Sequence, residues 1–160
     1  MRDKVLSPLL LLAAVSLFTP PVEAAYTRWP GASCQSVFNA SDITFNTAGT
    51  VLNTSTTGGH TIICPVQMPY LFGPGKTITV HIRFDTSAAV SCTLRLTSTA
   101  GLIQDSDSGT SSPQATLILS IQNDTVYSLE YSASLRCTLP PTSATLGAQG
   151  IVSYLVNHPD

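Results

Sequence analysis

Apolar and polar residues alternate along much of this chain, which is the pattern of strands that bury one face and expose the other. Three runs show the alternation most clearly: Lys76 to Phe84, Val90 to Leu96 and Tyr127 to Leu139. Pro140-Pro141 ends the third run, because proline has no N–H to donate to a neighbouring strand. The turn-rich tripeptide Asp85-Thr86-Ser87 separates the first two runs, so we expect those two strands to form a hairpin.

Shorter apolar segments predict weaker strands at Ile43 to Phe45, Thr50 to Asn53, Thr61 to Val66, Ala115 to Ile121 and Ile151 to Val156. Turn residues predict loops at Gly58-Gly59, Met68 to Gly75 and Asp105 to Pro113. No window shows apolar residues at helical spacing with plausible caps, which argues against a helix-rich fold. Seven or eight short strands favour a single antiparallel β-sandwich, with a β-barrel as the alternative.

The first 24 residues follow a different pattern. Arg2 and Lys4 precede an apolar run from Val5 to Phe18, and Val22-Glu23-Ala24 then provides a small-residue cleavage site. We therefore expect residues 1–24 to be a cleaved signal peptide and residues 25–160 to form one domain. The apolar run is too short to span a membrane. The expected location is secreted, periplasmic or on the cell surface.

An oxidising compartment changes the expected role of the cysteines, which are Cys34, Cys64, Cys92 and Cys137. We expect two disulfides. Cys92 and Cys137 share the parity of the apolar residues in their strands, so both sulfur atoms should point into the core. Four cysteines allow three pairings, and we favour Cys34 with Cys64 and Cys92 with Cys137 because each pairing keeps its loop shorter. Zinc is disfavoured, since no C-x-x-C motif occurs.

The polar residues predict no cofactor or metal site. His60, His81 and His158 are far apart in sequence, and we interpret them as surface residues. Asp105-Ser106-Asp107-Ser108-Gly109 has the alternating carboxylates of a calcium loop but lacks the later ligands, so a solvated turn is preferred and a weak calcium site is the alternative. Motifs for nucleophilic, phosphate-binding and zinc enzymes are missing from the sequence. We therefore expect no catalytic residues and no enzyme.

Aromatic residues are the candidate ligand contacts, because flat rings stack on the apolar faces of sugars. Tyr26 and Trp29 lie near the start of the mature chain, and Tyr70 and Phe72 lie in the Pro/Gly-rich loop. In the alternative interpretation, Trp29 covers one end of the core and Tyr70 or Phe72 plugs its own loop. Three N-glycosylation sequons, at Asn39, Asn53 and Asn123, are expected by chance in a chain so rich in serine and threonine.

Charge excludes some partners and suggests another. Residues 25–160 carry five Lys or Arg and seven Asp or Glu, scattered without a basic stripe, so neither nucleic acid nor an anionic membrane is an expected partner. The strand from Ala115 to Ile121 lacks the charge or proline that usually protects a sheet edge. At an edge, this strand would add to the sheet of a second copy. In the alternative, it is a central strand buried on both faces.

Several short motifs carry a resemblance to known proteins: Ala32-Ser33-Cys34, Cys64-Pro65-Val66, Val90 to Leu94, Leu135 to Pro141 and Ile151 to Tyr154. In this order they resemble a group of small secreted bacterial proteins with four cysteines and no assigned activity. The Ala-Ser-Cys start and the stretch from Cys34 to Cys64 are also similar to pilin-like subunits of the spore-coat-U type. The resemblance implies a β domain held by disulfides, and it carries over no catalytic residue.

These patterns together predict a secreted, non-enzymatic β-sandwich with two disulfides. The preferred role is a structural or interaction protein at the cell surface. The alternative role is a glycan-binding module that uses Trp29, Tyr70 and Phe72.

Overall fold

The computed structural model describes residues 25–37, 40–68, 72–113, 115–124, 131–142 and 149–158. The predicted signal peptide, Tyr70 and the start of the predicted strand from Tyr127 lie outside the described residues. The described chain is almost wholly β, with two short 3-10 turns, η2 (Gly31–Ser33) and η3 (Ala40–Asp42).

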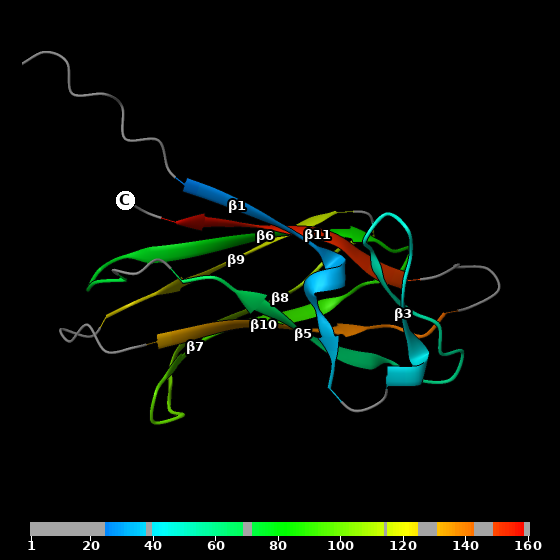
Figure 1. Ribbon diagram of the computed structural model, residues 1–160, viewed down its shortest axis with the longest axis horizontal. Helices are drawn as coiled ribbons and strands as arrows, with labels where there is room; N and C mark the ends of the chain where they lie inside the picture. Colours follow the sequence, from blue (N-terminus) through cyan, green and yellow to red (C-terminus); the bar gives the residue numbers. More distant parts are fainter. Residues whose placement is uncertain are drawn as a thin grey trace, which may run out of the picture.

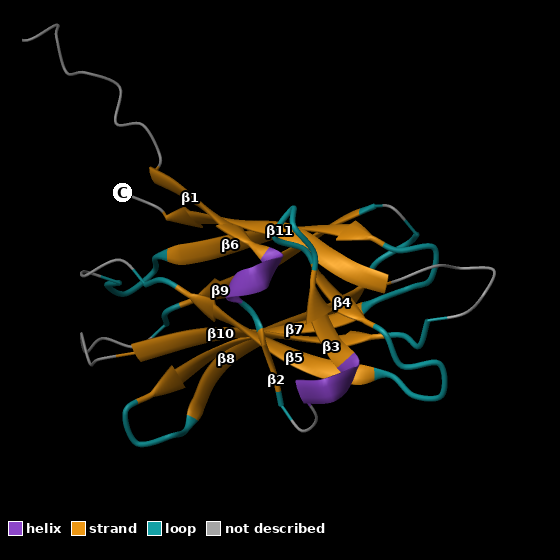
Figure 2. Ribbon diagram, turned by 45° about the vertical axis from the view of Figure 1, so that its right-hand side comes forward, coloured by secondary structure: helices purple, strands orange, loops and turns teal. Residues whose placement is uncertain are grey.

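Two antiparallel sheets stack face to face (Figures 1 and 2). The six-stranded sheet contains β1 (Ala25–Pro30), β3 (Ile43–Phe45), β4 (Val51–Asn53), β6 (Thr77–Asp85), β9 (Thr116–Gln122) and β11 (Gln149–His158). The five-stranded sheet contains β2 (Gln35–Ser36), β5 (His60–Val66), β7 (Ser91–Ser98), β8 (Ile103–Thr110) and β10 (Tyr131–Leu139). Their orders are β3-β4-β11-β6-β9, with β1 also pairing to β11, and β2-β5-β10-β7-β8. The predicted sandwich is confirmed.

The core lies between the two sheets and follows the alternation in the sequence. Ile78, Val80 and Ile82 of β6 are fully buried, as are Leu94 and Leu96 of β7. Each strand contributes every second side chain to this layer, because successive side chains point to opposite faces of a sheet. The same alternation leaves one face of each sheet open to solvent.

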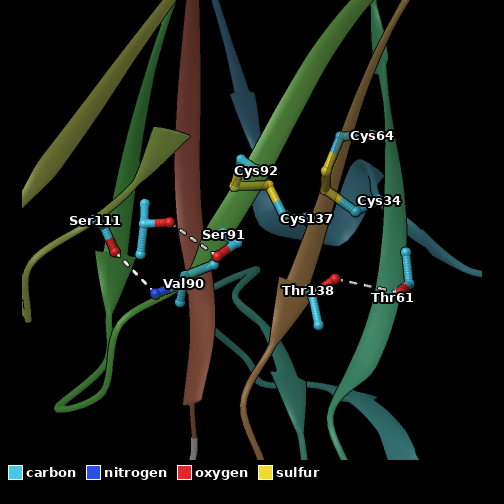
Figure 3. Close-up of a disulfide and its surroundings, with 10 residues drawn as sticks. Cys34, Thr61, Cys64, Val90, Ser91, Cys92, Ser111, Cys137 and Thr138 are labelled. Atoms are coloured by element: carbon cyan, nitrogen blue, oxygen red, sulfur yellow. Dashed lines mark hydrogen bonds between the residues drawn. A yellow bond between two sulfur atoms is a disulfide. The ribbon is translucent and has the colours of Figure 1, made fainter. Parts of the chain in front are cut away.

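Both predicted disulfides form. Cys34 bonds to Cys64 and Cys92 bonds to Cys137, and all four residues are buried (Figure 3). Cys92 and Cys137 face each other directly on β7 and β10, so this bond joins neighbouring strands of one sheet rather than the two sheets. In the chain-entropy account each bond stabilises the fold by about 3 to 4 kcal/mol.

The predicted hairpin between the runs at Lys76 to Phe84 and Val90 to Leu96 is wrong, because these strands belong to different sheets. The link between β6 and β7 crosses from one layer to the other. The side chain of Gln149 holds this crossing, since its Oε1 accepts hydrogen bonds from the N–H groups of Ser87 and Ala88 at 3.0 and 3.3 Å. Turn residues reverse the chain both in a hairpin within one sheet and in a connection between two sheets. Composition therefore could not distinguish these two structures.

Asp105 to Pro113, predicted as a loop, instead contains most of strand β8. Asp105 lies opposite Leu96 and Asp107 opposite Leu94, so both carboxylates share the inward side of the sheet with these leucines. The solvated-turn interpretation is therefore wrong. The prediction failed because the inward residues of β8 are polar, whereas the pattern of a half-buried strand requires apolar residues there.

The two carboxylates bond the edge of the other sheet. Asp107 Oδ2 accepts a hydrogen bond from the backbone N–H of Ser120 at 2.8 Å, and Asp105 Oδ2 accepts one from Gln122 N–H at 2.7 Å. The next inward residue is Gly109, where a Cβ would lie 2.9 Å from a methyl group of Leu117. These contacts between β8 and β9 are called the β8–β9 seam below.

Strand β9 ends the six-stranded sheet, so the alternative of a central strand buried on both faces is wrong. Ile118 on its outer side is 54% exposed, while Leu119 and Ile121 on its inner side are buried. Every second N–H of an edge strand points away from its single partner strand and is free to pair with another chain. In β9 the seam occupies two of these N–H groups with carboxylates.

A second contact joins the sheets inside the core. Tyr154 of β11 is 1% exposed, and its hydroxyl donates a hydrogen bond to the carbonyl oxygen of Pro65 in β5 at 2.7 Å. Burial raises the pKa of Tyr154 to about 12.

We predict that the β8–β9 seam keeps the protein monomeric. Replacing both carboxylates in Asp105→Ala/Asp107→Ala should lower stability by about 2 kcal/mol, because two charge-assisted hydrogen bonds are lost. The variant should also self-associate through the freed edge of β9. Sedimentation over a hundredfold concentration range measures the association, and a thermal melt measures the stability.

Two variants control this experiment. Ser106→Ala/Ser108→Ala changes the outer side of the same strand and should stay monomeric. Adding Ile118→Lys to the double aspartate variant should restore the monomer by placing a charge on the freed edge. A double aspartate variant that stays monomeric at every concentration would contradict the prediction.

We also predict an alkaline loss of stability from Tyr154. Its pKa is raised in the folded state, so the folded protein holds the phenol proton more tightly than the unfolded chain does. The resulting stability is present below about pH 10 and is lost as the pH rises towards 12, at roughly 1 kcal/mol per pH unit. Urea denaturation between about pH 8 and pH 11 measures this slope. Tyr154→Phe should be less stable at neutral pH but flatter above pH 10, and parallel curves would contradict the assignment.

Candidate functional site

The predicted aromatic contacts do not gather into one surface. Trp29 lies opposite Tyr154 in the β1–β11 register, which places Trp29 on the inner side, and it packs partly buried against the core. Phe72 is 6% exposed and belongs to the core. These placements match the alternative interpretation of both residues. Tyr26 is 60% exposed on the outer side of β1, and Tyr70 lies outside the described residues.

The histidines also separate. His60 lies 3.1 Å from Asp42, measured between Nε2 and Oδ2, and His81 is half-buried on the outer side of β6. His158 is buried at the end of β11, where burial lowers its pKa, so its interpretation as a surface residue is wrong. His158 lies on the inner side of β11 with Tyr154 and Val156, whereas the surface interpretation used only the wide sequence spacing of the histidines. Within the described residues, no three potential metal ligands cluster.

In two of the three sequons the asparagine side chain is buried and forms structural hydrogen bonds. Asn53 is fully buried, and its Nδ2 donates to the carbonyl oxygens of Pro140 and Gly58 at 2.8 and 3.1 Å. Asn123 is fully buried, and its Nδ2 donates to the carbonyl oxygen of Phe72 at 2.7 Å. A buried amide with bonded hydrogens offers no acceptor for a glycan. The third sequon, at Asn39, lies outside the described residues.

The outer face of the five-stranded sheet carries the candidate site. A groove of about 260 Å³ opens at its β2–β5 edge and is lined by Gln35, Ser36, Val37, Ile63 and Pro65. Ile63 is 40% exposed, and Pro65 is exposed beside it. The disulfide from Cys34 to Cys64 fixes the two lining segments relative to each other, because it joins the residue before Gln35 to the residue between Ile63 and Pro65.

Two rows of side chains continue from the groove across the sheet. In the first row Ile63 lies opposite Arg136, which is followed by Thr93 and Ser108. In the second row Pro65 lies opposite Ser134, which is followed by Arg95 and Ser106. All these residues share the outer face, because residues directly opposite each other in a sheet point the same way.

The hydroxyl groups of these two rows differ from those of the row beside them. In the neighbouring row, Thr61 bonds to Thr138 at 3.4 Å and Ser91 bonds to Thr110 at 3.0 Å, between side-chain oxygens (Figure 3). In the Ile63 row and the Pro65 row, the side-chain hydroxyls form no hydrogen bond with another described side chain. These hydroxyls belong to Thr93, Ser106, Ser108 and Ser134. The two rows therefore present hydroxyls and guanidinium groups that are free to bond a ligand.

Sequence reasoning did not find this surface. Its parts are a few residues on each of five strands, and the rows exist only once the strands are in register. The available signal was the outward parity of Arg95 and Arg136 in two of the clearest strands, but the sequence did not show that these strands are neighbours.

Comparisons with known proteins identify the fold and no family. No family model matches the chain, and no curated protein matches it. A solved structure described as a xylan-binding module, CBM15, covers 86% of this chain and 99% of its own length, with 11% identity and a TM-score of 0.50. Another, the ligand-free module BiXyn10A CBM1, covers 83% of this chain and 97% of its own length, with 11% identity and a TM-score of 0.55. This chain shares their β-sandwich fold.

The resemblance to four-cysteine secreted proteins stays a prediction, because these comparisons do not test it. The described residues include no helix of the length and apolar character needed to cross a membrane.

We predict that Phe72 is a core residue rather than a ligand contact. Phe72→Ala should destabilise the protein by about 3 kcal/mol, because it leaves a cavity beneath the loop that Asn123 anchors. Tyr26→Ala should leave the melting temperature unchanged, since the ring is largely exposed. Thermal melts of the two variants make the comparison, and a Phe72→Ala variant as stable as Tyr26→Ala would contradict the placement of Phe72.

Proposed function

We propose that this chain is an extracellular, non-catalytic module that binds a polysaccharide on the outer face of its five-stranded sheet. The observation that carries the proposal is the groove at Ile63 and Pro65, continued by two rows of free hydroxyl groups. Sugars have apolar C–H faces and hydroxyl edges. An apolar groove beside hydrogen-bonding side chains matches both surfaces.

The position of the site favours a ligand that is longer than the groove. The rows run across neighbouring strands, and strands in a sheet lie about 4.8 Å apart. From Ile63 on β5 to Ser108 on β8 the first row crosses four adjacent strands. An extended chain lying along such a row would meet one side chain on each strand.

Fold and disulfides support the same proposal. The structural neighbours described above include a xylan-binding module, and the likeness covers nearly the whole length of that module. Two disulfides fit an oxidising location, where polysaccharide ligands occur.

One form of the structural role expected from the sequence, a subunit that associates through its own strands, loses its main support. That role depended on an unprotected edge at β9. The carboxylates of Asp105 and Asp107 occupy backbone N–H groups of that edge, so strand addition there would have to break both contacts.

The experiment is affinity electrophoresis of the purified protein through gels that contain cellulose derivatives, neutral xylan, glucuronoxylan or polygalacturonate. At least one polysaccharide should retard the protein. Ile63→Ala should weaken the retardation roughly fivefold, because the ligand loses apolar contact area in the groove. The melting temperature should stay within a few degrees, since Ile63 is partly exposed.

A matched control is Ile118→Ala, which removes an exposed isoleucine from the outer face of the other sheet. This variant should bind as tightly as the wild type. Equal losses of affinity in Ile63→Ala and Ile118→Ala would show that the polysaccharide does not bind in the groove. No retardation by any of the polysaccharides would overturn the proposed function.

A further inference from the structure

We infer that the ligand of this face is an acidic polysaccharide whose uronate carboxylates are bound by Arg95 and Arg136. The inference rests on the proposed function and names the chemical class of its ligand. It is carried by the placement of the two arginines and by the lack of acidic residues among the described outward positions around them.

The two arginines lie on neighbouring inner strands of the five-stranded sheet. Arg136 of β10 is opposite Thr93 of β7, and Arg95 of β7 is opposite Ser134 of β10. The arginines are therefore diagonal neighbours on one face. Residues in this relation lie about 7 to 8 Å apart between Cα atoms, which is within reach for long side chains. Both are half-buried, so their stems lie against the surrounding residues.

Within the described strands, no carboxylate opposes the arginines on this face. Among the outward positions of the described strands β2, β5, β10, β7 and β8, the charged residues are Arg95 and Arg136 alone. The aspartates of this sheet, Asp105 and Asp107, point inward and bond β9. Neither guanidinium forms an ion pair with any described residue. A chain of net charge −2 thus presents a locally cationic face.

The chemistry of the arginine side chain selects the ligand group. A guanidinium presents a planar set of N–H donors that matches a carboxylate in a two-bond arrangement. Arg136 also lies directly opposite Ile63 of the groove. A sugar chain that packs on Ile63 and runs along the first row therefore places its neighbouring rings beside the arginines. Uronate residues would supply a carboxylate at that position.

The other sheet provides charge-matched controls. Arg28 and Arg83 also lie on an outer face, that of the six-stranded sheet, but they are on β1 and β6 with β11 between them. Asp85 is on the same outer side of β6 as Arg83, two residues further along. These arginines carry the same charge without forming a pair or bordering the groove.

The experiment compares polygalacturonate, glucuronoxylan and alginate with the carboxyl-reduced form of each polymer. At least one acidic polymer should bind about tenfold or more tightly than its reduced form. Arg95→Gln and Arg136→Gln should each weaken that binding roughly tenfold, because each removes a charge-assisted contact. Arg28→Gln and Arg83→Gln should leave it unchanged. Raising the ionic strength from about 0.1 M to about 1 M should weaken the binding of the acidic polymer by the wild-type protein, since the screening length falls from about 10 Å to about 3 Å.

A second pair of variants separates the two-bond contact from simple charge. Arg95→Lys and Arg136→Lys keep the charge and should fold normally, but they should still lose several-fold in affinity because lysine cannot form the planar two-bond contact. Equal binding of polyglutamate or dextran sulfate would show attraction to any polyanion and would overturn the inference.

The remaining outcomes distinguish this inference from the proposed function. Equal binding of acidic and reduced polymers, with the glutamine variants unaffected, overturns the acidic ligand and leaves a polysaccharide-binding module. Failure to bind every polymer, acidic and neutral, overturns both.

Discussion

Two aspartates that turn inward from β8 connect the fold of this protein with its surface. Their carboxylates bond backbone N–H groups at the edge of β9, so the outermost strands of the two sheets are joined on that side of the sandwich. An exposed row of N–H groups would otherwise pair with another chain. Because both side chains point inward, their negative charge is withdrawn from the outer face of the five-stranded sheet, where Arg95 and Arg136 have no acidic neighbour among the described residues.

Disulfides and a hydrogen bond fix the other strands that support the outer face of the five-stranded sheet. The Cys34–Cys64 bond holds the short strand β2 against β5, where only two residues pair. The Cys92–Cys137 bond joins the two inner strands that carry the arginines. Tyr154 ties β11 to the backbone of β5 across the core. A surface held in this way loses little conformational entropy when a ligand binds, which favours affinity from modest contacts.

The outer face combines three kinds of side chain in register, namely apolar residues in a groove, free hydroxyls and paired arginines. None of these groups is unusual alone. In the proposed function, their combination on one face would provide packing, hydrogen bonding and charge for the same extended ligand. Two of the aromatic residues that the sequence offered for this role, Trp29 and Phe72, pack in or against the core instead.

The sequence by itself determined the strands with one apolar side and the inward direction of Cys92 and Cys137. It favoured the two disulfide pairings that form, but three pairings were open until the strands were placed. Alternation is a local property, so it can be read without knowing the neighbours of a strand. It missed β8, because aspartates at 105 and 107 satisfy backbone N–H groups of another strand rather than an apolar core. It also placed β6 and β7 in one sheet, since the same turn residues serve a hairpin and a crossing. Only the tertiary structure decided which strands are neighbours, and hence that Ile63, Arg136 and Arg95 share one face, because strand order depends on contacts between residues far apart in the chain.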